Sequence, residues 1–137
     1  MTATETSDRT IRDWAYKTLA DLGPLITHLE TTREEDWQTD IVRSGDGTRN
    51  CFFGHLHAWG GDDAHGSALW DAFEELWSTS YRIYPVNDGK NPDYKQPTAK
   101  QRVLAYLRNL GSGAELTTCQ SMEAEYQAHL AAQEAKG

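Results

Sequence analysis

Cys51 is the residue best placed for covalent chemistry, because it lies at the expected start of a helix. The free amides and the dipole at a helix N-terminus favour the thiolate form of such a side chain. His55 follows one turn later as a candidate general base, and Asn87 or Asp88 is the candidate group to orient its ring. This set predicts a cysteine-dependent hydrolase or transferase as an alternative function. A buried structural thiol is the simpler interpretation, because free cysteines are mostly buried.

Histidines and aspartates between residues 55 and 65 have the side chains of a metal site without its spacing. They are His55, His57, Asp62, Asp63 and His65. On a helix, residues two apart point to nearly opposite sides, so His55 and His57 do not share a face. The string also differs from His-Glu-x-x-His, which places two ligands together. We therefore expect no metal and no cofactor.

The loop after residue 87 is rich in oxygen ligands, namely Asp88, Asn91 and Asp93. It lacks the Asp-x-Asx-x-Asx-Gly pattern of a helix-loop-helix calcium site, and predicts an Asx-stabilised turn instead. The sequence also contains no phosphate-binding loop, dinucleotide fingerprint or Gly-x-Ser-x-Gly elbow. Several common enzyme classes are thereby excluded.

Charge is distributed unevenly along an acidic chain, in which 13 Lys and Arg against 21 Asp and Glu give a net charge of -8. This balance disfavours general nucleic-acid binding and an anionic membrane surface, which both require Lys and Arg. Residues 60–80 carry five acids and no base: Asp62, Asp63, Asp71, Glu74 and Glu75. Residues 90–108 carry Lys90, Lys95, Lys100, Arg102 and Arg108 against Asp93 alone. Opposed charges of this kind steer a complementary protein.

Three aromatic residues in expected loops or strand ends, Trp37, Tyr84 and Tyr94, are candidate interface anchors. The predicted binding set joins them to Asp62, Asp63, Glu74 and Glu75. The main hypothesis is a non-enzymatic, small acidic binding module with a protein partner. A specific version is a phage-encoded inhibitor of a host or defence protein, in which the inhibitor mimics the charge of a nucleic acid. A solvated surface that only aids solubility is the plainer alternative, and the oligomeric state is left open.

Apolar residues recur at helical spacing in several segments. The expected helices cover residues 11–22, 25–29, 51–59, 67–78, 99–110 and 118–130. Gly23 should end the first and Asn50 should cap the third. Thr98 and Gln101 form a capping-box signature, and Gly111 should end the helix that follows them. Thr117 or Thr118 is the expected cap of the last helix.

Two segments, 37–42 and 81–86, have the alternating or β-branched character of short strands. Residues 44–47, Ser-Gly-Asp-Gly, supply the positive-φ positions of a hairpin turn. The chain of 137 residues suits one core. We therefore predict a mainly α (α+β) fold with a small β-hairpin or short strands, as a polar tail at 1–8 and a single helical domain at 9–137.

No apolar stretch approaches the roughly 20 residues that span a bilayer, and the polar N-terminus lacks the regions of a secretory signal. A cytoplasmic location is the expectation, in which Cys51 and Cys119 stay reduced.

Short motifs in the middle of the chain are Asn50-Cys51-Phe52-Phe53-Gly54-His55-Leu56, Tyr84-Pro85-Val86-Asn87-Asp88-Gly89 and residues 101–107. With Trp37, they resemble an uncharacterised family of small actinobacterial and actinobacteriophage proteins, over about residues 10–111. In that family a Cys-x-x-Gly helix start precedes an Asn-Asp turn and a closing amphipathic helix. The resemblance implies a compact helical fold and a phage or actinobacterial source, and it implies no catalytic residues.

Overall fold

The computed structural model describes residues 13–39, 51–60 and 63–136, and in these ranges the chain is helical with short connections and no strand. A helical segment at 13–19 comes first. It is followed by α2 (Gly23–Thr31), the 3-10 turn η1 (Glu34–Asp36), α3 (Phe52–Gly60), α4 (Ala64–Glu75), α5 (Trp77–Asp88), α6 (Ala99–Ser112) and α7 (Leu116–Lys136). The prediction of a mainly α fold is confirmed. The hairpin turn at 44–47, Asn50 and residues 40–42 of the 37–42 segment lie outside the described residues.

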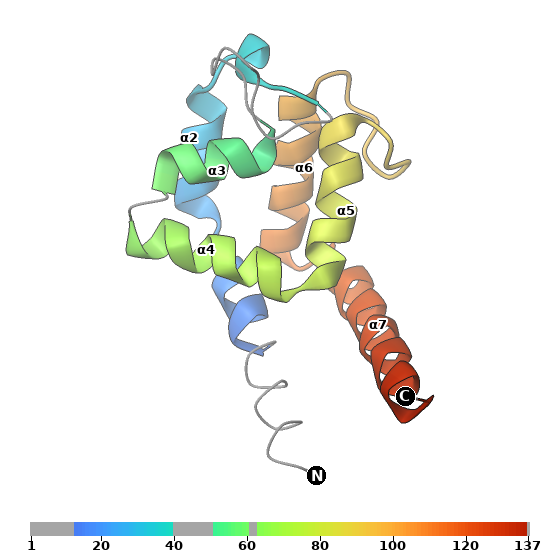
Figure 1. The fold of residues 1–137 in the computed structure, drawn as a ribbon. Coiled ribbons are helices and arrows are strands. Elements are labelled where there is room, and N and C mark those ends of the chain that lie inside the picture. Colours follow the sequence, from blue (N-terminus) through green and yellow to red (C-terminus); the bar gives the residue numbers. More distant parts are fainter. Residues whose placement is uncertain (1–12, 40–50, 61–62, 137) are drawn as a thin grey trace.

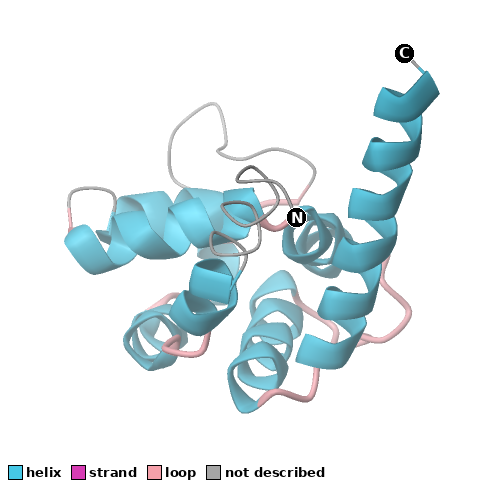
Figure 2. Ribbon diagram, turned by 90° about the horizontal axis from the view of Figure 1, so that it is seen from below, coloured by secondary structure: helices cyan, strands magenta, loops and turns pink. Residues whose placement is uncertain are grey.

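The helices surround one hydrophobic core. Figure 1 shows α3 and α4 crossing one face of the molecule, with α5 and α6 side by side and α2 behind α3. Phe52 packs edge-on against Phe73 at 5.1 Å between ring centroids, which joins α3 to α4. Tyr106 and Leu107 of α6 are fully buried. Figure 2 shows α7 extending away from the other helices, and its N-terminal part packs against α5.

The predicted strand at 81–86 is wrong, because these residues belong to α5. Thr79, Ile83 and Val86 are buried at spacings of four and three residues, which is the pattern of a helix face. Burial of this face outweighs the β propensity of its branched and aromatic side chains. The predicted helix at 67–78 is interrupted at Leu76, where the backbone is extended between α4 and α5.

Helix ends were predicted with mixed success. The Thr98 cap is confirmed, since its hydroxyl accepts a hydrogen bond from the Gln101 amide at 3.2 Å. Gly111 does not end α6; Gly113 does, with the left-handed φ of 91° that glycine adopts readily. Gly23 is the first residue of α2 rather than a left-handed cap, because Pro24 favours the first turn of a helix. The last helix begins at Leu116, before the expected threonine caps.

Two glycines allow α3 and α4 to approach closely. A Cβ built at Gly66 would collide with Gly60 O and Cα, and would lie 2.6 Å from the Gly60 carbonyl carbon. Asp63 caps α4 through its carboxylate, which accepts a hydrogen bond from the Gly66 amide at 3.4 Å. The two helices are thereby held with their backbones in contact. Across the described residues, no helix is long and apolar enough to cross a membrane.

Candidate binding site

Cys51 lies directly before α3, and its carbonyl accepts the first helical hydrogen bond, from the His55 amide at 3.0 Å. Burial raises the pKa of the Cys51 thiol, and the nearby Asp88 carboxylate adds to this effect. Amides of Phe53 and Gly54 oppose the shift, as expected at a helix N-terminus, but they do not offset the burial. The thiol is therefore not activated by its helix.

The other members of the proposed catalytic set have separate partners. His55 Nε2 lies 3.1 Å from the carbonyl oxygen of Asp36, and the ring packs on Trp37 at 4.2 Å between centroids. Burial lowers the pKa of His55, which favours the neutral ring. Asn87 does reach the start of α3, where its Oδ1 accepts a hydrogen bond from the Phe52 amide at 3.0 Å. In the described ranges, no hydrogen bond joins Cys51 to His55 or Asn87 through their side chains.

This geometry predicts slow alkylation of Cys51 in the folded protein. In a Cys119→Ser background, iodoacetamide should react with Cys51 at least about tenfold more slowly in buffer than in urea, because the thiol is 5% exposed and its pKa is raised. Reaction rates measured from pH 7 to 10 should give an apparent pKa above the ordinary value. Native reaction as fast as in urea, with a lowered apparent pKa, would instead support cysteine catalysis.

The structure separates the seven predicted binding residues. Trp37 and Tyr94 are only 7% and 4% exposed, so the prediction that they act as surface anchors is wrong. Their polar atoms are used internally: Trp37 Nε1 donates to Thr32 Oγ1 at 2.9 Å, and the Tyr94 hydroxyl donates to Glu115 at 2.7 Å.

The acidic members of that set differ in position. Asp62 lies outside the described residues, and Asp63 is the exposed cap of α4. Glu74 and Glu75 are exposed on α4, and Tyr84 is 50% exposed on α5. Three of the seven residues are thus available on the surface formed by α4 and α5.

Aromatic and acidic side chains meet on that surface. We call the residues Trp70, Asp71, Glu74 and Tyr84 the acidic aromatic face. Trp70 Nε1 donates to Glu74 Oε1 at 2.6 Å. The buried Phe53 ring packs against both Trp70 and Tyr84, at 5.4 and 5.1 Å between centroids. Burial raises the pKa of Tyr84, and the Cys51 and Glu74 charges raise it further, so the hydroxyl stays protonated near neutral pH.

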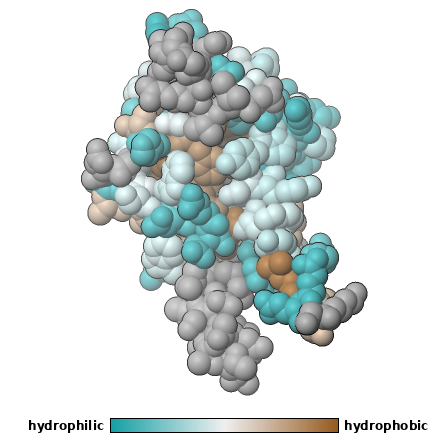
Figure 3. Space-filling view, in the orientation of Figure 1, coloured by the Kyte–Doolittle hydropathy of each residue, from teal (hydrophilic) through white to brown (hydrophobic). Residues whose placement is uncertain are grey.

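A cavity of about 370 Å³ adjoins this face between α3 and α4. Its walls are formed by Leu56, His57, Gly66, Ser67, Trp70 and Asp71. The His57 ring stands edge-on to Trp70 at 6.0 Å. Figure 3 shows the side of the molecule seen in Figure 1, where hydrophilic residues gather over α4 and hydrophobic residues lie at the centre. The residues that line the cavity thus include both apolar and polar side chains.

The basic segment at 90–108 is largely occupied with structural contacts. Arg102 donates from Nε and Nη2 to the carbonyls of Val86 and Asn87, both at 2.9 Å, which caps the end of α5. Lys100 donates to backbone carbonyls at the end of α2, and Arg108 pairs with Glu30 at 3.6 Å. Cations at helix C-termini are stabilising, and Arg102 and Lys100 of the basic segment serve in this way at the ends of α5 and α2. The predicted Asx turn is confirmed, since Asn91 Oδ1 accepts from the Asp93 amide at 2.9 Å.

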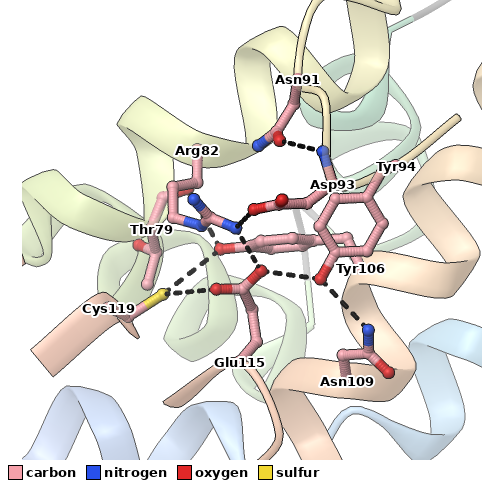
Figure 4. Close-up of polar contacts among 9 residues, drawn as sticks. All are labelled: Thr79, Arg82, Asn91, Asp93, Tyr94, Tyr106, Asn109, Glu115 and Cys119. Atoms are coloured by element: carbon pink, nitrogen blue, oxygen red, sulfur yellow. Dashed lines mark hydrogen bonds and ion pairs between the residues drawn. The ribbon is translucent and has the colours of Figure 1, made fainter. Parts of the chain in front are cut away.

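A buried polar network surrounds the carboxylate of Glu115, just before α7 (Figure 4). Its Oε1 accepts hydrogen bonds from Arg82 Nη2 and from the Tyr94 hydroxyl, both at 2.7 Å. Asn109 donates to the Tyr94 oxygen at 3.2 Å, and the Cys119 sulfur lies 3.9 Å from Glu115 Oε2. Burial disfavours the charge on Arg82, but its carboxylate partners more than compensate and raise its pKa.

The network fixes α7 rather than offering reactive groups. Burial raises the pKa of Cys119 to about 11, and burial also raises the pKa of Tyr94 and Tyr106, so all three stay protonated near neutral pH. A second buried carboxylate, Glu123 of α7, accepts from the Ser78 amide at 3.0 Å. These contacts hold the first half of α7 against α5. Among the described residues no group of three or more His, Cys, Asp or Glu could hold a metal ion.

The prediction missed Trp70 and Asp71 as a site. Trp70 belongs to the apolar stripe 69, 70, 73, 76 and 77, which the sequence assigns to the core. A signal was nevertheless present, because Trp70, Asp71 and Glu74 fall within about 100° of one another around a helix. The buried positions of α4, such as Leu69 and Phe73, lie on the other side.

Comparison with family models, curated proteins and solved structures gives no match for this chain. The resemblance to small actinobacterial and actinobacteriophage proteins therefore stays a prediction.

Proposed function

We propose that the protein is a non-enzymatic binding module whose acidic aromatic face docks on a basic segment of a protein partner. The observation that carries this proposal is the composition of one surface. Helices α3 and α4 contain no Lys or Arg, and α4 presents Trp70, Asp71 and Glu74 on one side. Tyr84 extends the same surface from α5.

Charge and aromatic area on one surface favour recognition over simple solubility. A surface that only aids solubility mixes both signs of charge and avoids large exposed rings. Partly exposed Trp and Tyr are typical interface anchors, because they bury large areas at a small cost in side-chain entropy. The negative field attracts a basic segment and orients it during encounter.

The catalytic alternative is less well supported by the same structure. Cys51 has a raised pKa and His55 is bound to a backbone carbonyl, so the usual activation of a thiol by an imidazole is missing from the described geometry. The more specific idea, a phage-encoded inhibitor of a host or defence protein, stays a prediction.

Peptide selection tests the proposal. A displayed library of random 12-residue peptides, selected on the wild-type protein, should yield sequences enriched in Lys and Arg. Their binding should fall at least about tenfold for Asp71→Asn, which removes one of the two carboxylates of the face. Glu125→Gln is the matched control, because it makes the same charge change on the exposed side of α7. Peptides without excess basic residues, or equal binding to both variants, would contradict the proposal.

A further inference from the structure

We infer that the cavity between α3 and α4 is a binding site for one arginine side chain of the partner. This inference rests on the proposed function and specifies which group of the basic segment enters the protein. The cavity volume of about 370 Å³ is at the lower end of the usual range for ligand pockets. It therefore suits a single side chain, while the rest of the segment lies over the acidic aromatic face.

The walls match the chemistry of a guanidinium group. Asp71 lines the cavity and is exposed, and within the described part of the chain no hydrogen bond or ion pair engages its carboxylate. A free carboxylate is the natural bidentate partner of arginine. Trp70 supplies an aromatic wall, on which the flat guanidinium stacks better than a hydrated ammonium does. The His57 imidazole also lines the cavity, and an imidazole nitrogen is able to accept a hydrogen bond.

The key wall is held in place before any ligand arrives. The indole N–H of Trp70 is bound to Glu74 at 2.6 Å, and its ring is contacted edge-on by Phe53 and His57. A side chain with these restraints has little rotamer freedom left to lose on binding. Glu74 also places a second negative charge beside the indole, which strengthens the attraction of a cation to the ring.

Other ligand classes fit the cavity less well. An anion would meet the Asp71 carboxylate in the cavity wall, and α3 and α4 contain no Lys or Arg to receive it. A purely apolar group would leave the Asp71 carboxylate desolvated and unpaired, which is costly. Lysine satisfies the charge but lacks the flat, forked donor set, so arginine is expected to bind more tightly.

Titration with capped amino acids tests this assignment. The probes are N-acetyl-arginine N-methylamide and its lysine and citrulline counterparts, followed by ¹H–¹⁵N NMR on the full chain. The arginine probe should give saturable shifts at the Trp70 indole N–H and at the amides of Ser67 and Asp71. Its dissociation constant should be about tenfold lower than that of the neutral citrulline probe and at least about threefold lower than that of lysine.

Two variants distinguish binding in the cavity from nonspecific electrostatic attraction to the acidic protein. Asp71→Asn should weaken arginine binding about tenfold, and Trp70→Phe, which keeps a ring against Phe53, should weaken it about threefold. Glu125→Gln should leave it unchanged. Equal affinity for arginine and citrulline, or shifts spread over all acidic residues without saturation, would overturn the inference. If Asp71→Asn abolishes peptide binding but replacing the arginines of the peptide with lysine has no effect, the arginine site is wrong and the proposed function stands. If no basic peptide binds the wild-type protein, the proposed function itself is overturned.

Discussion

Replacing Glu115 with alanine is expected to lower the free energy of unfolding by about 3–5 kcal/mol. Glu115 is 5% exposed, and its carboxylate is the shared acceptor of Arg82 and Tyr94. Its removal leaves a partly buried guanidinium with Asp93 as its remaining carboxylate, and the side chain of Asp93 is 64% exposed. Removing Glu115 lowers the free energy of unfolding by more than the Arg82–Glu115 ion pair contributes to it, because the Arg82 charge stays desolvated without its buried partner. Urea denaturation followed by tryptophan fluorescence measures the change.

Two controls identify the origin of this loss. Glu125→Ala removes an exposed carboxylate from the same helix and should change the unfolding free energy by less than about 0.5 kcal/mol. Alkylation of Cys119, which is fully buried beside Glu115, should become faster in Glu115→Ala if the start of α7 detaches. A loss below about 1 kcal/mol with unchanged Cys119 reactivity would contradict the assigned role of the network.

Gly66→Ala should have the second largest effect, a destabilisation of about 2–3 kcal/mol. The new Cβ would collide with the backbone of Gly60, and backbone atoms cannot rotate aside as a flexible side chain does. Helices α3 and α4 would have to separate, which also distorts the cavity that both helices line. Thermal and urea unfolding give the magnitude, and a repeat of the arginine titration reports on the cavity.

Gly111→Ala is the matched control for that substitution. No atom outside its immediate neighbours lies within 4 Å of a Cβ built at Gly111, which is inside α6. Alanine should therefore stabilise the protein by about 0.4–1 kcal/mol through its better helix propensity and a less flexible unfolded chain. Opposite signs for the two substitutions are expected. Equal, small effects would show that α3 and α4 do not approach as closely as described.

Local patterns in the sequence predicted most helices, because helix formation is governed by spacing and caps over a few residues. The Thr98 cap is an example, since its hydroxyl needs only the Gln101 amide three residues later. Segment 81–86 shows the limit of this approach. Its aromatic and branched residues favour a strand locally, and only packing of Ile83 and Val86 in the core selects the helix.

The site was harder to predict than the fold, because exposure depends on contacts between distant segments. Trp37 looked like a loop anchor, but it packs on His55 from α3. Tyr94 is buried, and its hydroxyl donates a hydrogen bond to Glu115, 21 residues later in the chain. Trp70 shows the reverse case, in which a ring assigned to the core is only partly buried and lines a cavity.

The interpretation of Cys51 as a buried structural thiol is confirmed, since the residue is 5% exposed and unpaired with the other cysteine. Amides at the start of α3 do lower the pKa of its thiol, as helix electrostatics predicts. Burial raises that pKa by more, and burial could not be read from the spacing of Cys51 and His55 alone. The fold, and not the sequence, brings Asn87 to this helix start, where its Oδ1 accepts a hydrogen bond from the Phe52 amide and does not orient His55.

The most direct test of the proposed docking surface is calorimetry with one selected basic peptide and two variants of equal charge. Asp71→Asn and Glu125→Gln each remove one negative charge, the first within the acidic aromatic face and the second on α7. We expect Asp71→Asn to weaken binding about tenfold and Glu125→Gln to have an effect of less than about twofold. Equal weakening by both substitutions would mean that the peptide responds to net charge alone, and would contradict a defined binding site on α3, α4 and α5.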